Sequence, residues 1–304
     1  MPTEAGLPGW LLGVDFSCAP DHRKPITVAW GQRHGTVVKL DRLDSLPTLS
    51  DFEHLLSLAH PRAAEGWLGG FDFPFGLPRV FVDALGLVTT ADQPECDALI
   101  THLQQRAQTR QGFQTLVDQW GHSWGMGTRP AKLPHRRCDT ALPGTASTSP
   151  LQTRYVPVGK MYFEGLSRLV AADIALPGLR ARRPTTSPAP TRLALEAYPG
   201  LLATEVLGKQ SYKSDDKARQ TDDRLVQRLS LIDALEQGRT RLGLRLKLSP
   251  AQRDHLASDA KGDRLDAVLC LLQAGWGHQR LAEGDTRVGL PADVDPVEGW
   301  ILTA

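Results

Sequence analysis

The chain has few of the residues that build disulfide frameworks or zinc sites. Its 304 residues include four cysteines, Cys18, Cys96, Cys138 and Cys270, and none of them forms a CxxC pair. Its nine histidines show no HxxxH or HExxH spacing, the spacing that places two zinc ligands on one helix face. A zinc hydrolase and a disulfide-stabilised secreted domain are therefore disfavoured, and a reducing cytoplasm is the compartment that we expect.

Long apolar runs and a strong charge of either sign are also missing. No run approaches the roughly 20 apolar residues of a membrane-spanning helix, so we expect no membrane partner. The first residues, MPTEAGLPGW, have neither the basic start nor the apolar stretch of a signal peptide. The formal net charge of +1 argues against a general positive potential but is compatible with a local basic groove.

Two further enzyme classes lack their motifs. Ser147 and Ser149 have no G-x-S-x-G frame, which argues against a serine hydrolase. The glycines of "GMGT", residues 125–128, have neither the lysine nor the strand and helix context of a phosphate loop.

What the chain does have is an ordinary globular composition, with 41% hydrophobic and 23% charged residues. Its length suits one large domain or a core that carries an insertion. We predict a single domain over residues 1–304, with a core at about 8–78 and 191–304 and an insertion at about 79–190. The long Gly-, Pro-, Ser- and Thr-rich stretches of the insertion, 121–157 and 176–190, are expected to shape a substrate site.

Short apolar runs near the start of the chain predict strands. Three runs separated by short polar turns predict an antiparallel meander: Trp10–Phe16, Ile26–Trp30 and Gly35–Leu40. Ser50 and Glu53 form a capping box before an apolar stripe, which predicts a crossover helix. Gly66–Asp72 then reads as a fourth strand that runs parallel to the first.

The later part of the chain predicts a fifth strand and several helices. The fifth strand is Arg192–Pro199, and the tail Val297–Ile301 is a candidate terminal strand. Helical segments are predicted at about 97–120, 163–169, 222–237, 250–258 and 261–275. The expected fold class is therefore α/β, with the meander, a crossover helix, two further parallel strands and helices on both faces.

Acidic residues stand at or near the ends of three predicted buried strands, at Asp15, Asp72 and Glu196. In open α/β sheets, ligands bind at the carboxyl edge of the strands, so these side chains are expected to converge if the strands are neighbours. Clustered carboxylates repel one another and raise one another's pKa. A hard divalent cation, Mg²⁺ or Mn²⁺, would remove that conflict.

A second pair of acids begins a late predicted helix, "GDRLDAVLCLLQAG". Asp263 and Asp266 are three residues apart and therefore share one helix face, while leucines supply a separate apolar stripe. Taken singly, each acid has an ordinary alternative: a turn residue for Asp15, a cap for Asp72, and surface acids that complement the helix dipole for this pair. Glu196 taken alone is equally well explained by a structural hydrogen bond. The combination favours a metal site.

The order of these motifs, "GVDFS", "GGFDFPFGLP", "LEAYP", "KGDRLDAVLC" and "EGWI", resembles an uncharacterised family of predicted nucleases with the ribonuclease H fold. The resemblance runs from Gly13 to about Ile301, and it is loose in the insertion. It implies a ribonuclease H-like core in which acids on the first strand, the fourth strand and a C-terminal helix hold two divalent cations. The matching positions are Asp15, Asp72, Asp263 and Asp266.

The resemblance has a departure as well as a parallel. The i,i+3 acid pair on the helix is similar to that of Holliday-junction resolvases. No clear acid takes the position that ribonuclease H proper uses on its crossover helix, where Glu53 is the remaining candidate, and Glu196 looks like an addition. This departure argues against simple cleavage of RNA–DNA hybrids.

Two basic segments are candidate phosphate contacts. "LPHRRCD" supplies Arg136 and Arg137 beside His135, and "GKQSYKSDDKAR" supplies Lys209, Lys213, Lys217 and Arg219 after the fifth strand. Tyr212 and Trp124 are candidate stacking partners for bases. Interleaved lysines and acids are also typical of a solvated surface. Lys213 is preferred as a catalytic cation because it resembles a family "YK" position.

These patterns together predict a nuclease or phosphodiesterase that uses two Mg²⁺ or Mn²⁺ ions on a nucleic-acid or nucleotide substrate. A phosphotransferase or ATPase of the same superfamily is one alternative, and a non-catalytic nucleic-acid-binding protein is another. Near-neutral charge favours local, structure-selective binding over long tracking along a duplex. The sequence leaves DNA, RNA, junction and small-nucleotide substrates open, and it leaves the oligomeric state open.

Overall fold

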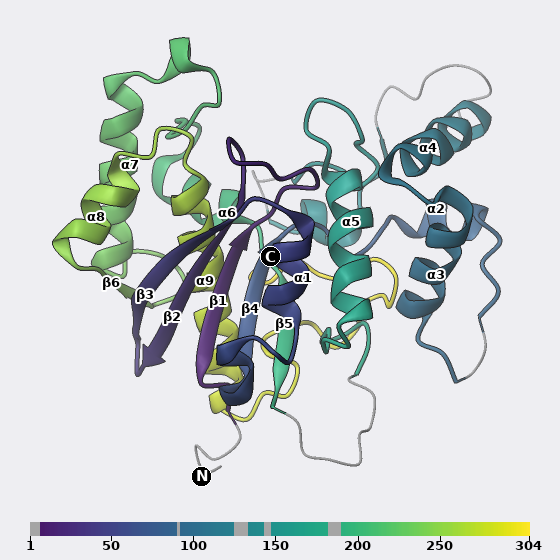
Figure 1. The fold of residues 1–304 in the computed structure, drawn as a ribbon, viewed down its shortest axis with the longest axis horizontal. Coiled ribbons are helices and arrows are strands. Elements are labelled where there is room, and N and C mark those ends of the chain that lie inside the picture. The colour runs from purple at the N-terminus through teal and green to yellow at the C-terminus, as the bar shows by residue number, and fades with distance from the viewer. Residues whose placement is uncertain (1–6, 90–91, 125–132, 143–146, 182–189) are drawn as a thin grey trace.

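The computed structural model describes residues 7–89, 92–124, 133–142, 147–181 and 190–304. Within them, six strands form one mixed sheet in the order β5-β4-β1-β2-β3-β6 (Figure 1). The strands are β1 (Trp10–Asp15), β2 (Ile26–His34), β3 (Val37–Leu46), β4 (Trp67–Asp72), β5 (Arg192–Glu196) and β6 (Arg245–Lys247). The first three strands are antiparallel to one another, while β4 pairs parallel with β1 and β5 pairs parallel with β4.

Helices cover both faces of this sheet, which confirms the predicted mixed α/β class (Figure 1). They are α1 (Leu49–Leu56), α2 (Arg79–Ala84), α3 (Glu95–Ala107), α4 (Arg110–Trp124), α5 (Val158–Ala171), α6 (Pro199–Leu207), α7 (Asp222–Glu236), α8 (Pro250–Ala257) and α9 (Asp263–Ala282). Three short 3-10 turns are η1 (Pro61–Glu65), η2 (Arg137–Thr140) and η3 (Lys217–Arg219). No helix in the described ranges is both long and apolar enough to cross a membrane.

The alternation of side chains along the strands divides the core into two layers. On β1, Leu12 and Val14 join a cluster with α1 and α5, whereas Leu11 joins a cluster with α7 and α9 on the other face. Helix α9 lies along β1, β2 and β4 on this second face. Because Gly13 and Asp15 share the parity of Leu11, they belong to the face that α9 covers.

Glycine permits the close approach of α9 to the sheet. A Cβ atom on Gly13 would stand 2.0 Å from the carbonyl oxygen of Ala267, and one on Gly70 would stand 2.6 Å from that of Cys270. Both distances are far below van der Waals contact, so a side chain at either position would push α9 away. These glycines set how near the start of α9 comes to the ends of β1 and β4.

Helices α2 to α5 come from the predicted insertion and lie beside the α1 face of the sheet (Figure 1). The helix predicted at about 97–120 is two helices, because α3 is capped by Gln108 with a φ of 60° and α4 restarts at Arg110. Phe113 and Phe163 bring α4 and α5 into the same apolar cluster as α1. The insertion thus shares a core with the sheet.

Several other local predictions were wrong. The cap of α1 is Thr48, which exchanges hydrogen bonds with Asp51, so the capping box starts two residues before Ser50. The fifth strand ends at Glu196, because Pro199 starts α6, where its missing N–H has no intrahelical partner to lose. The predicted terminal strand is reduced to a single bridge between Ile301 and Glu196. Strand β6 was not predicted.

Candidate active site at the carboxyl ends of β1 and β4

Asp15 and Asp72 are the last residues of two neighbouring parallel strands and are direct partners in their register. Both side chains are partly exposed and belong to the face that α9 covers. The chain turns tightly after β4, because the N–H of Phe73 donates to the carbonyl oxygen of Phe71 at 2.9 Å. Phe71 and Phe73 then pack against each other on the opposite face, which fixes the backbone on both sides of Asp72.

The first turn of α9 supplies the other two predicted acids. Asp263 is the first residue of the helix and is partly exposed, whereas Asp266 is buried, with a relative exposure of 1%. The helix starts after Gly262, whose φ of 79° suits glycine and whose carbonyl accepts the N–H of Asp266 at 2.9 Å. Gly262 also leaves room for the side chain of Lys213, since a Cβ atom there would stand 2.7 Å from Lys213 Cβ.

Two residues that are neighbours in sequence donate hydrogen bonds to the carboxylate of Asp266. The hydroxyl of Tyr212 donates to Oδ1, and the ammonium of Lys213 donates to Oδ2. Arg228 holds this segment in place, because its guanidinium donates to the carbonyl oxygens of Tyr212 at 2.8 Å and Ala257 at 2.7 Å. Tyr212 is therefore buried and used inside the protein, so the structure does not offer it as a stacking surface for a base.

The four acids act on one another electrostatically. Burial raises the pKa of Asp15 well above its usual value, and the charges of Asp266, Asp72 and Asp263 raise it further. Burial also raises the pKa of Asp72, to about 7, with Asp266 as the next largest cause. Burial and then the charge of Asp259 raise the pKa of Asp263. This is the unfavourable grouping of carboxylates that the sequence predicts.

Lys213 provides the opposite charge in this group. Burial alone would lower its pKa, but Asp266, then Asp15 and Asp72, outweigh burial and raise the pKa well above the usual value. Its side chain is nevertheless 43% exposed, so the ammonium reaches both Asp266 and solvent. Lys213 thus lies where the sequence-based prediction put it, beside the acids.

The donor set suits a hard cation only in part. In the described ranges, no three His, Cys, Asp or Glu side chains are close enough together to enclose a metal ion as they stand. Asp266 is already bonded to Tyr212 and Lys213. Among the described residues, however, the carboxylates of Asp15 and Asp72 receive no hydrogen bond, and oxygen ligands of this kind fit Mg²⁺ or Mn²⁺, which keep several waters when bound. The residues present therefore fit a cation held mainly by this pair.

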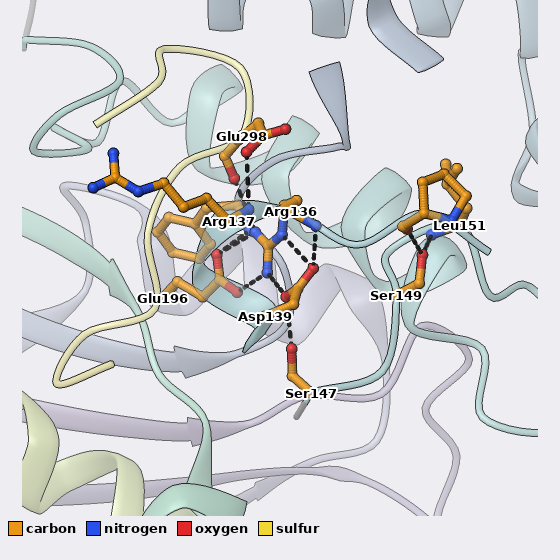
Figure 2. Close-up of polar contacts among 10 residues, drawn as sticks. Arg136, Arg137, Asp139, Ser147, Ser149, Leu151, Glu196 and Glu298 are labelled. Atoms are coloured by element: carbon orange, nitrogen blue, oxygen red, sulfur yellow. Dashed lines mark hydrogen bonds and ion pairs between the residues drawn. The ribbon is translucent and has the colours of Figure 1, made fainter. Parts of the chain in front are cut away.

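Glu196 belongs to a different group. It pairs in register with Phe71, one residue before Asp72, so its side chain belongs to the opposite face of the sheet. There it is buried and forms a two-pronged ion pair with Arg136, with N–O distances of 2.7 and 2.6 Å (Figure 2). It also accepts the backbone N–H of Phe75 at 2.8 Å. The structure does not bring Glu196 to the carboxylates of β1 and β4.

Arg136 is equally committed to the interior. Its side chain is 1% exposed and also donates to Asp139 and to the carbonyl oxygen of Glu298 (Figure 2). Burial opposes its charge, but Glu196, then Cys138 and Asp139, outweigh burial and raise its pKa. With its donors directed at protein oxygens, Arg136 is placed as a structural cation rather than as a phosphate contact.

The other predicted basic residues of the two segments lie on the surface. Arg137 is exposed, with Asp293 at 2.5 Å and the Trp300 ring beneath its guanidinium. Lys209, Lys217 and Arg219 are exposed, the last two on η3, and Arg219 is 3.5 Å from Asp216. His135 is partly buried, and the side chain of Trp124 lies outside the described side chains. Glu53 of α1 pairs with Arg168 at 2.9 Å.

The structure adds two residues that the sequence reasoning missed. Lys24, in the β1–β2 loop, forms an ion pair with Asp215 at 2.9 Å, and Asp263 and Asp15 contribute to raising its pKa. Thr27 is buried directly opposite Asp15 in the register of β1 and β2. The predicted antiparallel meander could have indicated both residues, because β2 starts beside the end of β1, where Asp15 lies.

Two cavities differ in their relation to the acids. The larger, about 950 Å³, is bordered by α1, α3, α4 and α5 and includes Glu53, Arg110 and Arg168, none of which belongs to the carboxylate group. The smaller, about 350 Å³, has Asp263 and Thr27 in its wall. Because the acids carry the shifted pKa values, we place the candidate site at the strand ends and not in the larger cavity.

Known proteins do not add to this picture, since no family model, no curated protein and no solved structure matches the chain. The resemblance to predicted nucleases therefore stays a prediction that rests on the motifs, and function has to be argued from the site.

Proposed function

We propose that the protein is a divalent-metal-dependent phosphodiesterase that acts on nucleic acid, built on a ribonuclease H-like core. The observation that carries the proposal is the side-by-side pairing of Asp15 and Asp72 beneath the acidic first turn of α9. A strand order of β5-β4-β1-β2-β3, with only the first three strands antiparallel, is the arrangement expected for such a core.

The raised pKa values support a cation at this position. With a pKa of about 7, the carboxyl group of Asp72 is partly protonated near neutral pH. A bound divalent cation would lower the pKa of Asp72 and of Asp15 and keep both side chains charged. Asp15 and Asp72 would hold the cation, and the partly exposed Asp263 would border it. A bound Mg²⁺ or Mn²⁺ supplies a water of lowered pKa and positive charge for the phosphate oxygens.

Lys213 and Asp266 have a linked role in the proposal. Asp266 accepts the ammonium of Lys213 on one oxygen and the hydroxyl of Tyr212 on the other. The side chain of Lys213 is 43% exposed, so a substrate could reach it from solvent. The ammonium would stabilise negative charge that develops on the phosphate during hydrolysis. Asp266 then acts as a positioning residue, because its two oxygens contact protein donors.

The test is cleavage of labelled oligonucleotides with and without Mn²⁺ or Mg²⁺. Single-stranded DNA and RNA, duplexes and a four-way junction form the panel. We expect cleavage that EDTA abolishes and that falls roughly a hundredfold or more in Asp15→Asn and Asp72→Asn. The matched control is Asp83→Asn, an exposed acid of α2, which should cleave like the wild type.

A second readout is independent of activity. Mn²⁺ that binds the folded protein should raise its melting temperature, and Asp72→Asn should reduce that rise while Asp83→Asn leaves it unchanged. Wild-type protein that cleaves no member of the panel in either metal, and that Mn²⁺ does not stabilise, would contradict the proposal. ATP-dependent phosphate transfer, or oligonucleotide binding without cleavage, would favour the two alternatives.

A further inference from the structure

The smaller cavity lies beside the carboxylates and has a different chemical character. Its wall is made by the β1–β2 loop, the start of β2, the end of β3, and the segment from Asp259 to Arg264 that leads into α9. It comprises His22, Arg23, Pro25, Thr27, Ser45, Pro47, Asp259, Lys261, Asp263 and Arg264. A volume of about 350 Å³ is large enough for roughly ten water molecules, and so for a tetrahedral oxyanion with part of its hydration.

The sheet register aligns this cavity with the acids. Asp72 pairs with Asp15, Asp15 pairs with Thr27, and Thr27 pairs with Ser45, so four side chains form one row across four strands. Strands are spaced about 4.8 Å apart, which puts the hydroxyl side chains of the row roughly 5 and 10 Å from Asp15. The row changes from carboxylates to hydroxyls where the cavity begins.

The cavity wall also contains cationic side chains that form no ion pair with a described carboxylate. Among the described residues, the guanidinium groups of Arg23 and Arg264 have no carboxylate within ion-pair distance. Asp259, which also lines the cavity, accepts the backbone N–H of Arg264 at 2.9 Å. Lys261 donates to the carbonyl oxygen of Arg23, which ties the two sides of the wall together. Three cationic side chains, Arg23, Lys261 and Arg264, therefore border the cavity together with two acids, Asp259 and Asp263.

We propose that this cavity is a subsite for a phosphate group of the nucleic-acid strand, next to the phosphate that is hydrolysed. Arg23 and Arg264 bind the phosphate oxygens, and the hydroxyl of Ser45 donates a further hydrogen bond. The proposal rests on the proposed function for its substrate class. It explains how a chain with a net charge of +1 would hold a polyanion, through a local cationic cavity beside the acids and not through its whole surface.

Binding of a fluorescein-labelled single-stranded oligonucleotide, in EDTA and over a series of salt concentrations, tests the subsite. The variant is Arg23→Gln with Arg264→Gln. Its control is Arg106→Gln with Lys39→Gln, which removes two exposed cations from α3 and β3. We expect the first variant to bind several-fold more weakly and to reduce the slope of log affinity against log salt by about 1. The control should match the wild type.

A small substrate separates this inference from the proposed function. Bis(p-nitrophenyl) phosphate carries one phosphodiester and has no second phosphate for the cavity. Its Mn²⁺-dependent hydrolysis should be unchanged in Arg23→Gln/Arg264→Gln, while cleavage of the oligonucleotide falls through a higher KM. An excess of inorganic phosphate should compete with the oligonucleotide only weakly if the strand is the natural ligand.

The outcomes are distinguishable. Equal oligonucleotide affinity and salt slope in the variant and the wild type would overturn the subsite and leave the hydrolytic function standing. Weakened binding in the variant, with no hydrolysis of any substrate by the wild type, would support the subsite and overturn the function. A wild-type protein that binds no oligonucleotide would overturn the subsite as a nucleic-acid site.

Discussion

Asp15 and Asp72 end adjacent parallel strands as register partners, so two carboxylates lie side by side at one edge of the sheet. Burial raises the pKa of both, and the charge of Asp266 on α9 raises it further. This arrangement does not favour the stability of the metal-free protein, because like charges that lie close together repel each other. The consequences can be measured.

The first prediction concerns stability against pH in the metal-free protein. Folding raises the pKa of Asp72 from 3.8 to about 7, so between these values the folded state binds more protons than the unfolded state. By linkage, this group makes the free energy of unfolding fall as pH rises through that window. Urea denaturation in EDTA should show Asp72→Asn gaining stability over the wild type near pH 8 and not near pH 4. Asp83→Asn should follow the wild type at both pH values, and an identical response of the two variants would contradict the shift.

The second prediction concerns Lys213. Lys213→Met removes the ammonium from Asp266 and leaves the acids without their nearest cation. We expect the metal-free variant to lose roughly 1–3 kcal/mol, at the lower end because the lysine is partly exposed. Mn²⁺ should then raise the melting temperature of the variant more than that of the wild type, because the metal no longer competes with an ammonium. Arg219→Met, which removes an exposed cation of η3, is the control. A smaller rise in Lys213→Met than in the wild type would show that the lysine does not compete with the metal.

The third prediction concerns the contact between the sheet and α9. Gly13→Ala places a methyl group against the backbone of Ala267 and Leu271 and should destabilise the protein strongly, by roughly 3 kcal/mol or more. Gly121→Ala, in α4, meets no atom within 4 Å and should be neutral or stabilising by up to about 1 kcal/mol. Thermal unfolding compares the two variants. Equal melting temperatures would mean that α9 can move away from the sheet without a loss of stability.

The fourth prediction concerns the buried ion pair of Arg136 and Glu196. Arg136→Met leaves Glu196 and Asp139 buried without their cation and should lower the free energy of unfolding by about 3–5 kcal/mol. Adding Glu196→Gln removes one of the unpaired charges and should recover part of that loss. If the double variant is no more stable than Arg136→Met, the charge of Glu196 contributes nothing to the loss.

The positions of helices and strands could be predicted from the sequence better than the face of the sheet on which each side chain lies. Strand ends follow from apolar runs and turn residues, so the positions of Asp15 and Asp72 at two neighbouring strand ends could be predicted. Glu196 shows the limit, because it stands opposite Phe71 and not opposite Asp72. A shift of one residue in register moves a side chain to the other face, and no local pattern in the sequence specifies the register between β4 and β5.

The remaining differences also have physical causes. Both Thr48 and Ser50 have a hydroxyl three residues before an acid. Thr48 forms the cap, and it is the one that follows the end of β3 more closely. The bond between Lys213 and Asp266 depends on Arg228 of α7, which holds the segment before it, and contacts of this range have no signature in sequence spacing. Arg136 was predicted as a phosphate contact, but the buried acids Glu196 of β5 and Asp139 of η2 pair with it.

The division of the acids between β1 and α9 has a consequence for the order in which the protein is made. About 250 residues separate Asp15 from Asp266, so at 5–20 residues per second a ribosome needs roughly 10–50 s between them. Lys213 is synthesised before either acid of α9. In a nascent chain, Lys213 is therefore already present when Asp263 and Asp266 are added. A chain that ends before α9 lacks these two acids. The acidic group is therefore complete only after α9, the last helix of the described chain, docks against the sheet.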